Sequence, residues 1–223
     1  MKVTDLVLLS GGLDSSVLAY QLANKGKSLR AIYIDTGFKP ALNEKASAKH
    51  VADKLNIHLE IVEAPGLLSM TSAFYPTDFI GLDEWDKSRP LDPVPIPYVT
   101  GFAVPVAIAT FYAALAGIKT LNVGVLKDQV DTRTGLSNFL SDWPTLSNHL
   151  NPNAPVQIAA PFKGMTKAEV IKTGASLGVA LDRTWTCYRG EEIHCNRCGG
   201  CAARQSAFRE ANVNDATSYQ NVE

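Results

Sequence analysis

The first twenty residues contain the feature that most constrains the fold. Residues 6–9 are four consecutive apolar side chains, which predicts a buried strand. A Ser-Gly-Gly stretch follows directly, and after it Val17, Leu18 and Leu22 recur at helical spacing. The segment is therefore predicted to be a strand, a tight turn and a helix.

The turn at residues 10–16, Ser-Gly-Gly-Leu-Asp-Ser-Ser, is a candidate anion site. Gly11 and Gly12 let the backbone turn sharply and approach a ligand closely. The serines add hydroxyl groups, and the start of the helix adds free N–H groups. No Gly-Lys-Ser/Thr follows the glycines, so the turn differs from the common phosphate loop. The alternative is an ordinary glycine-rich turn in which Asp14 is a plain helix N-cap.

Strand and helix signals then alternate along the chain. Strands are expected at residues 29–35, 59–63, 120–125 and 156–161, and helices at 44–55, 99–118 and 136–150. This alternation predicts an α/β fold with a parallel sheet and right-handed crossovers. Ligands in such sheets bind at the carboxyl ends of the strands, where Ser10, Asp35 and Asp128 fall.

Residues 160–170 are expected to begin a further helix. Thr166 is a natural N-cap, and Glu169 three residues later completes a capping box. Lys167 lies in the first turn, where its charge opposes the helix dipole, and an anion at the helix start would account for it. A solvated lysine is the alternative.

Two other segments give weaker signals. Residues 64–98 contain six prolines and little periodicity, which is typical of a functional loop or lid, or of a surface excursion. Residues 211–223 are polar and are expected to form a frayed tail.

Four cysteines, all near the C-terminus, have the spacing C-x7-C-x2-C-x2-C. Zinc prefers four thiolates in a closed tetrahedral site, and an iron–sulfur cluster uses similar ligands. Two disulfides or a chance grouping are the alternatives. Gly199 and Gly200 are expected to allow a tight turn between ligands, and His194 is expected to be a bystander. The candidate ligands are Cys187, Cys195, Cys198 and Cys201.

Composition limits the partners. A net charge of −1 gives no overall basic field for nucleic acid, so no nucleic-acid partner is expected. Hydrophobic residues make up 46% and charged residues 19%, which is typical of a soluble globular protein. No apolar run approaches the ~20 residues of a membrane span, and no secretory signal is evident. A cytoplasmic location without a membrane partner is therefore expected.

The turn at residues 10–16 resembles the SGGxDS signature of the PP-loop ATP pyrophosphatases, which cleave ATP between the α- and β-phosphates and adenylate a substrate. Further motifs narrow the resemblance: IDTG at 34–37, APFKGMTKAEV at 160–170, and TWTCY at 184–188 leading into the cysteines. Together they resemble the 7-cyano-7-deazaguanine synthase (QueC/ExsB) family.

The family resemblance implies a Rossmann-like ATP pyrophosphatase domain over residues 1–180, a zinc-binding segment over 181–210 and a tail over 211–223. It also implies a homodimer that uses ATP, Mg²⁺ and Zn²⁺. The expected reaction adenylates the carboxylate of 7-carboxy-7-deazaguanine, and ammonia as amine donor converts it to the nitrile. The catalytic residues would be Asp14, Lys163 and Lys167. The ATP site would comprise Ser10, Gly11, Gly12, Leu13, Asp14, Ser15, Ser16 and Asp35.

The chain departs from the family pattern in the half that would bind the acid. Gly101-Phe102-Ala103 stands where the family has an Arg-Asn pair, and residues 131–136 replace a Gly-Tyr-Pro-Asp-Cys-Arg-like stretch. The candidate substrate contacts are Phe102, Asp128 and Arg133. Phe102 either stacks on a flat ring or fills space, and Arg133 is either an anion donor or a solvated loop residue.

Two alternative functions follow from these departures. One is a divergent ligase that joins a deazaguanine or other acid to a different amine, including one on a protein substrate. The other is a non-catalytic nucleotide-binding module whose zinc segment docks a partner.

Overall fold

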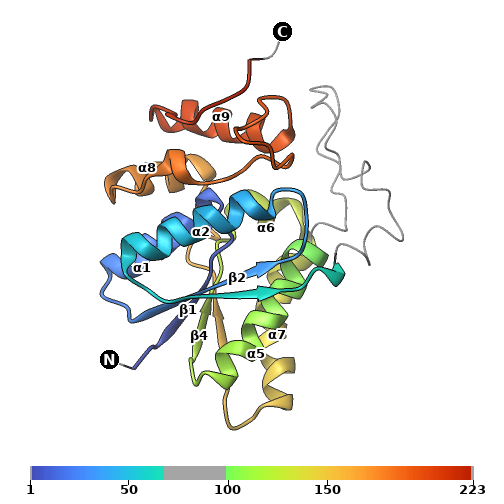
Figure 1. Ribbon diagram of the computed structural model, residues 1–223. Helices are drawn as coiled ribbons and strands as arrows, with labels where there is room; N and C mark the ends of the chain where they lie inside the picture. Colours follow the sequence, from blue (N-terminus) through green and yellow to red (C-terminus); the bar gives the residue numbers. More distant parts are fainter. Residues whose placement is uncertain (1, 68–98, 222–223) are drawn as a thin grey trace.

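The computed structural model describes residues 2–67 and 99–221. Within them, five parallel strands form one sheet in the order β3-β2-β1-β4-β5 (Figure 1). Residues 68–98 lie outside the described residues, and with them most of the predicted lid at 64–98. The strands are β1 Asp5–Leu8, β2 Leu29–Asp35, β3 Leu59–Glu63, β4 Thr120–Asn122 and β5 Gln157–Ala159.

Helices cover both faces of this sheet (Figure 1). On one face lie α1 and α2, with α8 packed on α1 and α9 on α8; α5 and α7 cover the other. None of the described helices is long and apolar enough to cross a membrane. The helices are α1 Leu13–Asn24, α2 Ala41–Leu55, α5 Val104–Leu115, α6 Lys127–Thr132, α7 Thr134–Leu150, α8 Lys167–Ser176 and α9 Gly199–Ala211, with shorter turns η2 Val99–Ala103 and η3 Leu181–Arg183.

The central strands β1 and β2 are mostly apolar because helices cover both of their faces. Successive side chains point to opposite faces, so Val7 packs in the core under α1 and α8, and Leu6 in the core under α5. Both side chains are fully buried. The predicted α/β class with a parallel sheet is therefore confirmed, and β2 and β3 have the predicted bounds.

Several element bounds differ from the predictions. The strand expected at 120–125 is only three residues long, and the expected helix at 99–118 is a π-helical turn followed by α5. α6 lies in a stretch where no helix was predicted. α6 buries none of its side chains and is held by a local ion pair between Lys127 and Asp131, 2.6 Å apart.

The two glycines between the cysteines also have a different role. Gly199 and Gly200 begin α9 instead of forming a turn between metal ligands. A Cβ at Gly200 would lie 2.2 Å from the Thr186 carbonyl oxygen, so glycine is required for the close approach of the two segments.

The prediction of a frayed tail at 211–223 is wrong for its described part. The Gln220 N–H donates to the His194 carbonyl at 2.8 Å, and Tyr219 forms a β-bridge with His194. The Tyr219 hydroxyl donates to Asp215 at 2.6 Å. The two contacts with His194 join the tail to the cysteine segment, residues 187–201, which a polar composition alone does not reveal.

Candidate active site and metal centre

The turn between β1 and α1 forms a narrow backbone cradle. Gly11 has φ of 74°, which favours glycine, and a Cβ there would lie 2.1 Å from the Glu44 carbonyl oxygen. The Ser10 and Ser15 hydroxyls lie 3.0 Å apart, and the Ser15 hydroxyl accepts from the Ser10 N–H at 3.2 Å. The loop is therefore fixed before any ligand binds.

The remaining loop residues start the helix. Gly12 is the N-cap of α1, and the Ser16 hydroxyl donates to the Gly12 carbonyl at 2.8 Å. Leu13 and Ser16 are buried, so their side chains anchor the loop, whereas Ser10 is exposed. The first N–H groups of a helix have no partner within it, so the start of α1 presents donors to an anion.

Asp14 and Lys167 bring the starts of α1 and α8 together. Lys167 Nζ lies 3.2 Å from Asp14 Oδ2, and both side chains are mostly buried. Asp14 Oδ1 is buried and has no hydrogen-bond partner among the described residues. An orphaned carboxylate oxygen beside a glycine cradle fits a phosphate with its counter-cation. Asp14 also offsets the unfavourable position of Lys167 at a helix start.

Asp35 lies at the carboxyl end of β2, and both of its carboxylate oxygens accept hydrogen bonds. Lys45 Nζ lies 2.6 Å from Oδ2, and the Gly37 N–H donates to Oδ1 at 3.0 Å. Burial alone would raise the pKa of Asp35, but the hydrogen bonds from Lys45 and Gly37 outweigh it and lower the pKa. Asp35 is therefore an anionic, oriented group at the site edge.

Glu44, which the sequence did not single out, lies beside the cradle, because its backbone carbonyl faces Gly11. It lies in the first turn of α2, and its Oε2 is 3.4 Å from the Tyr33 hydroxyl. Burial and the nearby Asp35 charge raise the pKa of Glu44 to about 7. The sequence around Glu44 shows only an ordinary helical glutamate. The Asp35 carboxylate and the Tyr33 hydroxyl, which both affect its pKa, belong to β2, and only the fold brings them beside it.

Trp185 is a second residue not singled out as a contact. Its backbone N–H donates to the Gly11 carbonyl at 2.9 Å, so the segment after η3 contacts the cradle at residues 10–16. The TWTCY motif at 184–188 drew attention to this segment. Only the fold shows that the segment supplies the Trp185 N–H to Gly11.

The other candidate residues lie in η2 and in the segments that follow β4 and β5. Lys163 is exposed in the turn after β5, and Asp128 is exposed in the first turn of α6. Arg133 caps the junction of α6 and α7, with Nη1 3.4 Å from the Thr132 hydroxyl. The Phe102 ring packs edge-on against Phe139, with centroids 6.0 Å apart.

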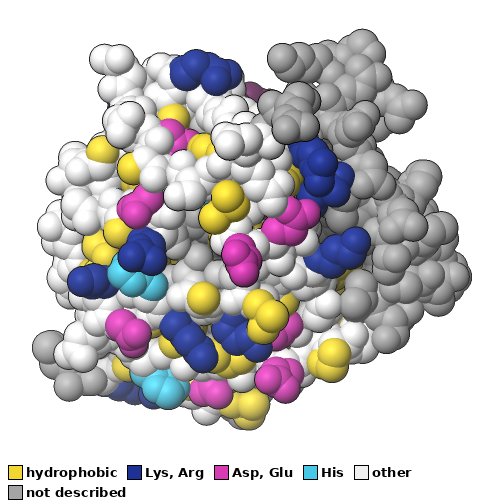
Figure 2. Space-filling view, turned by 45° about the horizontal axis from the view of Figure 1, so that its top comes forward, with side chains coloured by type: hydrophobic (Ala, Val, Ile, Leu, Met, Phe, Trp, Pro, Cys, Tyr) yellow, Lys and Arg dark blue, Asp and Glu magenta, His cyan; other side chains and the backbone are white. Residues whose placement is uncertain are grey.

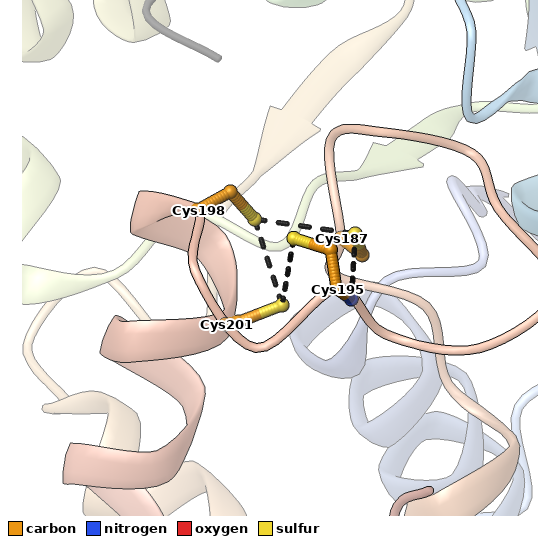
Figure 3. A group of neighbouring side chains, drawn as sticks. All are labelled: Cys187, Cys195, Cys198 and Cys201. Carbon is orange, nitrogen blue, oxygen red and sulfur yellow. Dashed lines mark hydrogen bonds between the residues drawn. The ribbon is translucent and has the colours of Figure 1, made fainter. Parts of the chain in front are cut away.

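The four cysteines converge at the start of α9 (Figure 3). Their Sγ atoms all lie within 4.8 Å of one another and can hold a metal ion. Three Sγ–Sγ distances are 3.5 Å for Cys198–Cys201, 3.9 Å for Cys195–Cys201 and 4.0 Å for Cys187–Cys198. All four side chains are buried and none forms a disulfide.

His194 lies beside this group but not in it. Its ring lies tilted against that of Trp185, with centroids 4.3 Å apart, and its Nε2 accepts from the Thr186 N–H at 3.2 Å. Burial and the Arg204 charge lower the pKa of His194 to about 4, so the ring is neutral near pH 7. His194 therefore links the four-cysteine group to the segment at residues 184–186 that contacts Gly11.

A parallel sheet with this loop after β1, and a lysine-bearing helix start beside it, defines the PP-loop class of ATP-using proteins. Within that class, the chain belongs to the family described as "Queuosine biosynthesis protein QueC", whose model matches residues 4–212.

Named relatives agree with this assignment. The 7-cyano-7-deazaguanine synthase of Thermoplasma volcanium is 33% identical over 96% of this chain and 90% of its own length. That of Brucella anthropi is 30% identical over 98% of this chain and 94% of its own. The 7-cyano-7-deazaguanine synthase 1 of Sulfurisphaera tokodaii is 29% identical over 97% of this chain and 98% of its own.

Solved structures share the fold at low identity. NMN synthetase from Francisella tularensis aligns with a TM-score of 0.54 and 13% identity over 96% of this chain and 79% of its own. The U34-tRNA thiolase NcsA from Methanococcus maripaludis aligns with a TM-score of 0.51 and 16% identity over 93% of this chain and 66% of its own. These likenesses support the Rossmann-like PP-loop architecture alone.

Proposed function

We propose that this protein is an ATP-dependent C–N ligase that converts 7-carboxy-7-deazaguanine to 7-cyano-7-deazaguanine with ammonia. The chain's relatives named 7-cyano-7-deazaguanine synthase align over nearly their full lengths. The observation that carries the chemistry is the Asp14–Lys167 pair, 3.2 Å apart at the glycine cradle. A passive adenosine binder would have no need of a second helix start with a lysine there.

In this mechanism the cradle at residues 10–16 binds the β- and γ-phosphates, the departing pyrophosphate. Lys167 and the exposed Lys163 offset the charge that develops as the bond to the α-phosphorus breaks. Asp35 holds the ribose or adenine, and Asp14 organises the phosphates. Mg²⁺, when bound, would neutralise phosphate charge, and the orphaned Asp14 Oδ1 is the candidate contact.

The reaction then balances in four steps. The substrate carboxylate attacks the α-phosphorus and releases pyrophosphate, and ammonia displaces AMP to give the amide. The amide oxygen attacks a second ATP, releasing pyrophosphate, and loss of AMP with the amide protons leaves the nitrile. The protein's contribution is mainly positioning and charge stabilisation. Phe102, Asp128 and Arg133 are the proposed contacts to the acid.

Zinc is the proposed occupant of the cysteine centre. Four thiolates at about 2.3 Å from one tetrahedral ion lie about 3.8 Å from one another. The three Sγ–Sγ distances of 3.5, 3.9 and 4.0 Å support a single ion over a cluster. Metal analysis of purified protein should give one zinc per chain, and a visible iron–sulfur absorption band would refute this assignment.

The decisive experiment incubates the protein with ATP, Mg²⁺, 7-carboxy-7-deazaguanine and ammonium, and reads the product by mass spectrometry. The nitrile mass supports the proposal. A product that stops at the mass of the amide contradicts it. No pyrophosphate release with any acid would favour a non-catalytic module.

The proposed assembly is a homodimer. Exposed apolar side chains on the outer helices are consistent with a contact surface: Leu115 on α5 is 87% exposed, and Leu146 and Leu150 on α7 are 59% and 77% exposed. Charged side chains of both signs are mixed on the face in Figure 2. Light scattering coupled to size-exclusion chromatography measures the assembly directly.

A further inference from the structure

Arg204 is a charged side chain in an unusual place. It lies in the middle of α9 with 0% of its surface exposed, although charged residues are almost never fully buried unless they are paired. It is neither a metal ligand nor part of the phosphate loop. Its partners therefore indicate what its burial achieves.

The guanidinium fork of Arg204 binds the segment that follows η3. Its Nη2 donates to the Leu181 carbonyl at 2.6 Å. Its Nη1 donates to the Thr184 hydroxyl at 2.9 Å and to the Thr186 hydroxyl at 3.1 Å. Three points along six residues are thus tied to one rigid, planar group.

The C-terminal tail balances this charge. Asp215 Oδ1 lies 3.5 Å from Arg204 Nε, and the hydrogen bonds of Asp215 to Thr217 and Tyr219 help to lower its pKa against the effect of burial. Asp215 lies beyond residue 212, where the family match ends. Asp215 of the tail therefore forms a buried ion pair with Arg204 of α9.

The segment tied by Arg204 is the one that contacts the phosphate loop. Trp185 lies between Thr184 and Thr186, and its N–H donates to the Gly11 carbonyl at 2.9 Å. On its other side, Gly11 lies against the backbone of Glu44 in α2. Gly11 is therefore clamped between α2 and a segment whose position depends on Arg204.

We infer that Arg204, together with Asp215, is a positioning residue for nucleotide binding. By fixing Thr184 and Thr186, it holds the Trp185 N–H against Gly11 and keeps the cradle at residues 10–16 ready for phosphates. A cradle that must be ordered during binding uses part of the binding energy for ordering. This inference rests on the proposed function only in taking ATP as the ligand.

The test compares Arg204→Lys with the matched control Arg209→Lys, which changes an exposed arginine on the same helix. Lysine retains the charge near Asp215, but its three donors share one nitrogen and cannot reproduce the planar fork in which Nη1 and Nη2 reach separate acceptors. Calorimetry measures the Kd of α,β-methylene-ATP with Mg²⁺, which needs no turnover. Pyrophosphate release gives KM and kcat, and hydrogen exchange reports on residues 10–16.

Arg204→Lys should raise the Kd of the analogue and the KM for ATP about tenfold while kcat changes less than about threefold, as for a loss of uniform binding. Amide exchange in the cradle should accelerate, metal content should stay at the wild-type value, and Arg209→Lys should match wild type. Thr184→Val, which removes one acceptor, should change Kd in the same direction by a smaller factor.

Unchanged Kd and cradle exchange in Arg204→Lys would overturn the inference. Loss of metal with a fall in kcat alone would assign Arg204 a purely structural role and also overturn it. If Arg204→Lys does not fold, Thr184→Val decides: an unchanged Kd overturns the inference. If wild type binds the analogue but releases no pyrophosphate with the acid, the proposed function fails while the Arg204 comparison remains valid.

Discussion

Glu44 offers a quantitative test of the electrostatics beside the phosphate loop. Its partly buried carboxyl lies 3.4 Å from the Tyr33 hydroxyl, and burial with the Asp35 charge raises its pKa from 4.5 to about 7. The variant Glu44→Gln has nearly the same shape and resembles the protonated carboxyl. It therefore removes the ionisation while retaining the packing.

The sign follows from proton linkage. Because the folded state binds this proton more tightly, the stability it contributes is fully present below pH 4.5 and is lost as pH rises through about 7. With about 1.4 kcal/mol for each tenfold change in proton affinity, the loss above pH 7 is at most about 3 kcal/mol. The free energy of unfolding of Glu44→Gln, measured relative to wild type, should therefore rise by about 2 kcal/mol when the pH is raised from 5.5 to 8.

The assay is urea unfolding of the metal-loaded proteins at pH 5.5, 6.5, 7.5 and 8. The control is Asp53→Asn, which removes one negative charge from an exposed position on the same helix. The difference in free energy of unfolding between Asp53→Asn and wild type should be nearly the same at all four pH values. If wild type and Glu44→Gln keep a constant stability difference across this range, the raised pKa of Glu44 is refuted.

Four further changes test the site. Lys167→Ala should abolish pyrophosphate release, because it removes the proposed phosphate-stabilising charge and leaves Asp14 without its ion-pair partner. Unchanged turnover would contradict the assigned role. Cys198→Ser should lose the metal in elemental analysis, whereas full retention would exclude Cys198 as a ligand. Gly11→Ala should lose nucleotide binding by calorimetry, since the new Cβ would lie 2.1 Å from a carbonyl oxygen. Thr166→Ala should cost about 1 kcal/mol in urea unfolding, because it removes the N-cap of α8, and a neutral result would argue against that cap.

The capping box at the start of α8 shows how far local pattern reaches. Thr166 accepts from the Glu169 N–H at 3.2 Å, and the Glu169 carboxylate accepts from the Thr166 N–H at 2.8 Å, as the spacing predicts. Both groups lie within one turn, so the chain alone determines the contact. The cysteine spacing likewise predicts a convergence that the four sulfurs confirm.

Contacts between segments far apart in the sequence could not be predicted from such local patterns. Two helices were not predicted: α6 is only six residues long, and α9 begins with the two glycines that had been assigned to a turn between ligands. Glu44 and Trp185 became site residues only when α2 and the segment after η3 closed on Gly11 from opposite sides. The tail residue Asp215 lies eleven positions after Arg204, and its role depends on the chain folding back.

From its sequence alone, this chain specifies alternating strands and helices, a glycine-serine loop at the first crossover and a four-cysteine group. These features depend on periodicity, turn chemistry and ligand spacing over a few neighbouring residues. The tertiary structure alone decides which groups surround the loop, which carboxyl is forced toward neutrality and which buried arginine connects the metal segment to Gly11. Burial and electrostatic coupling are properties of neighbours in space, and only the packed fold defines those neighbours.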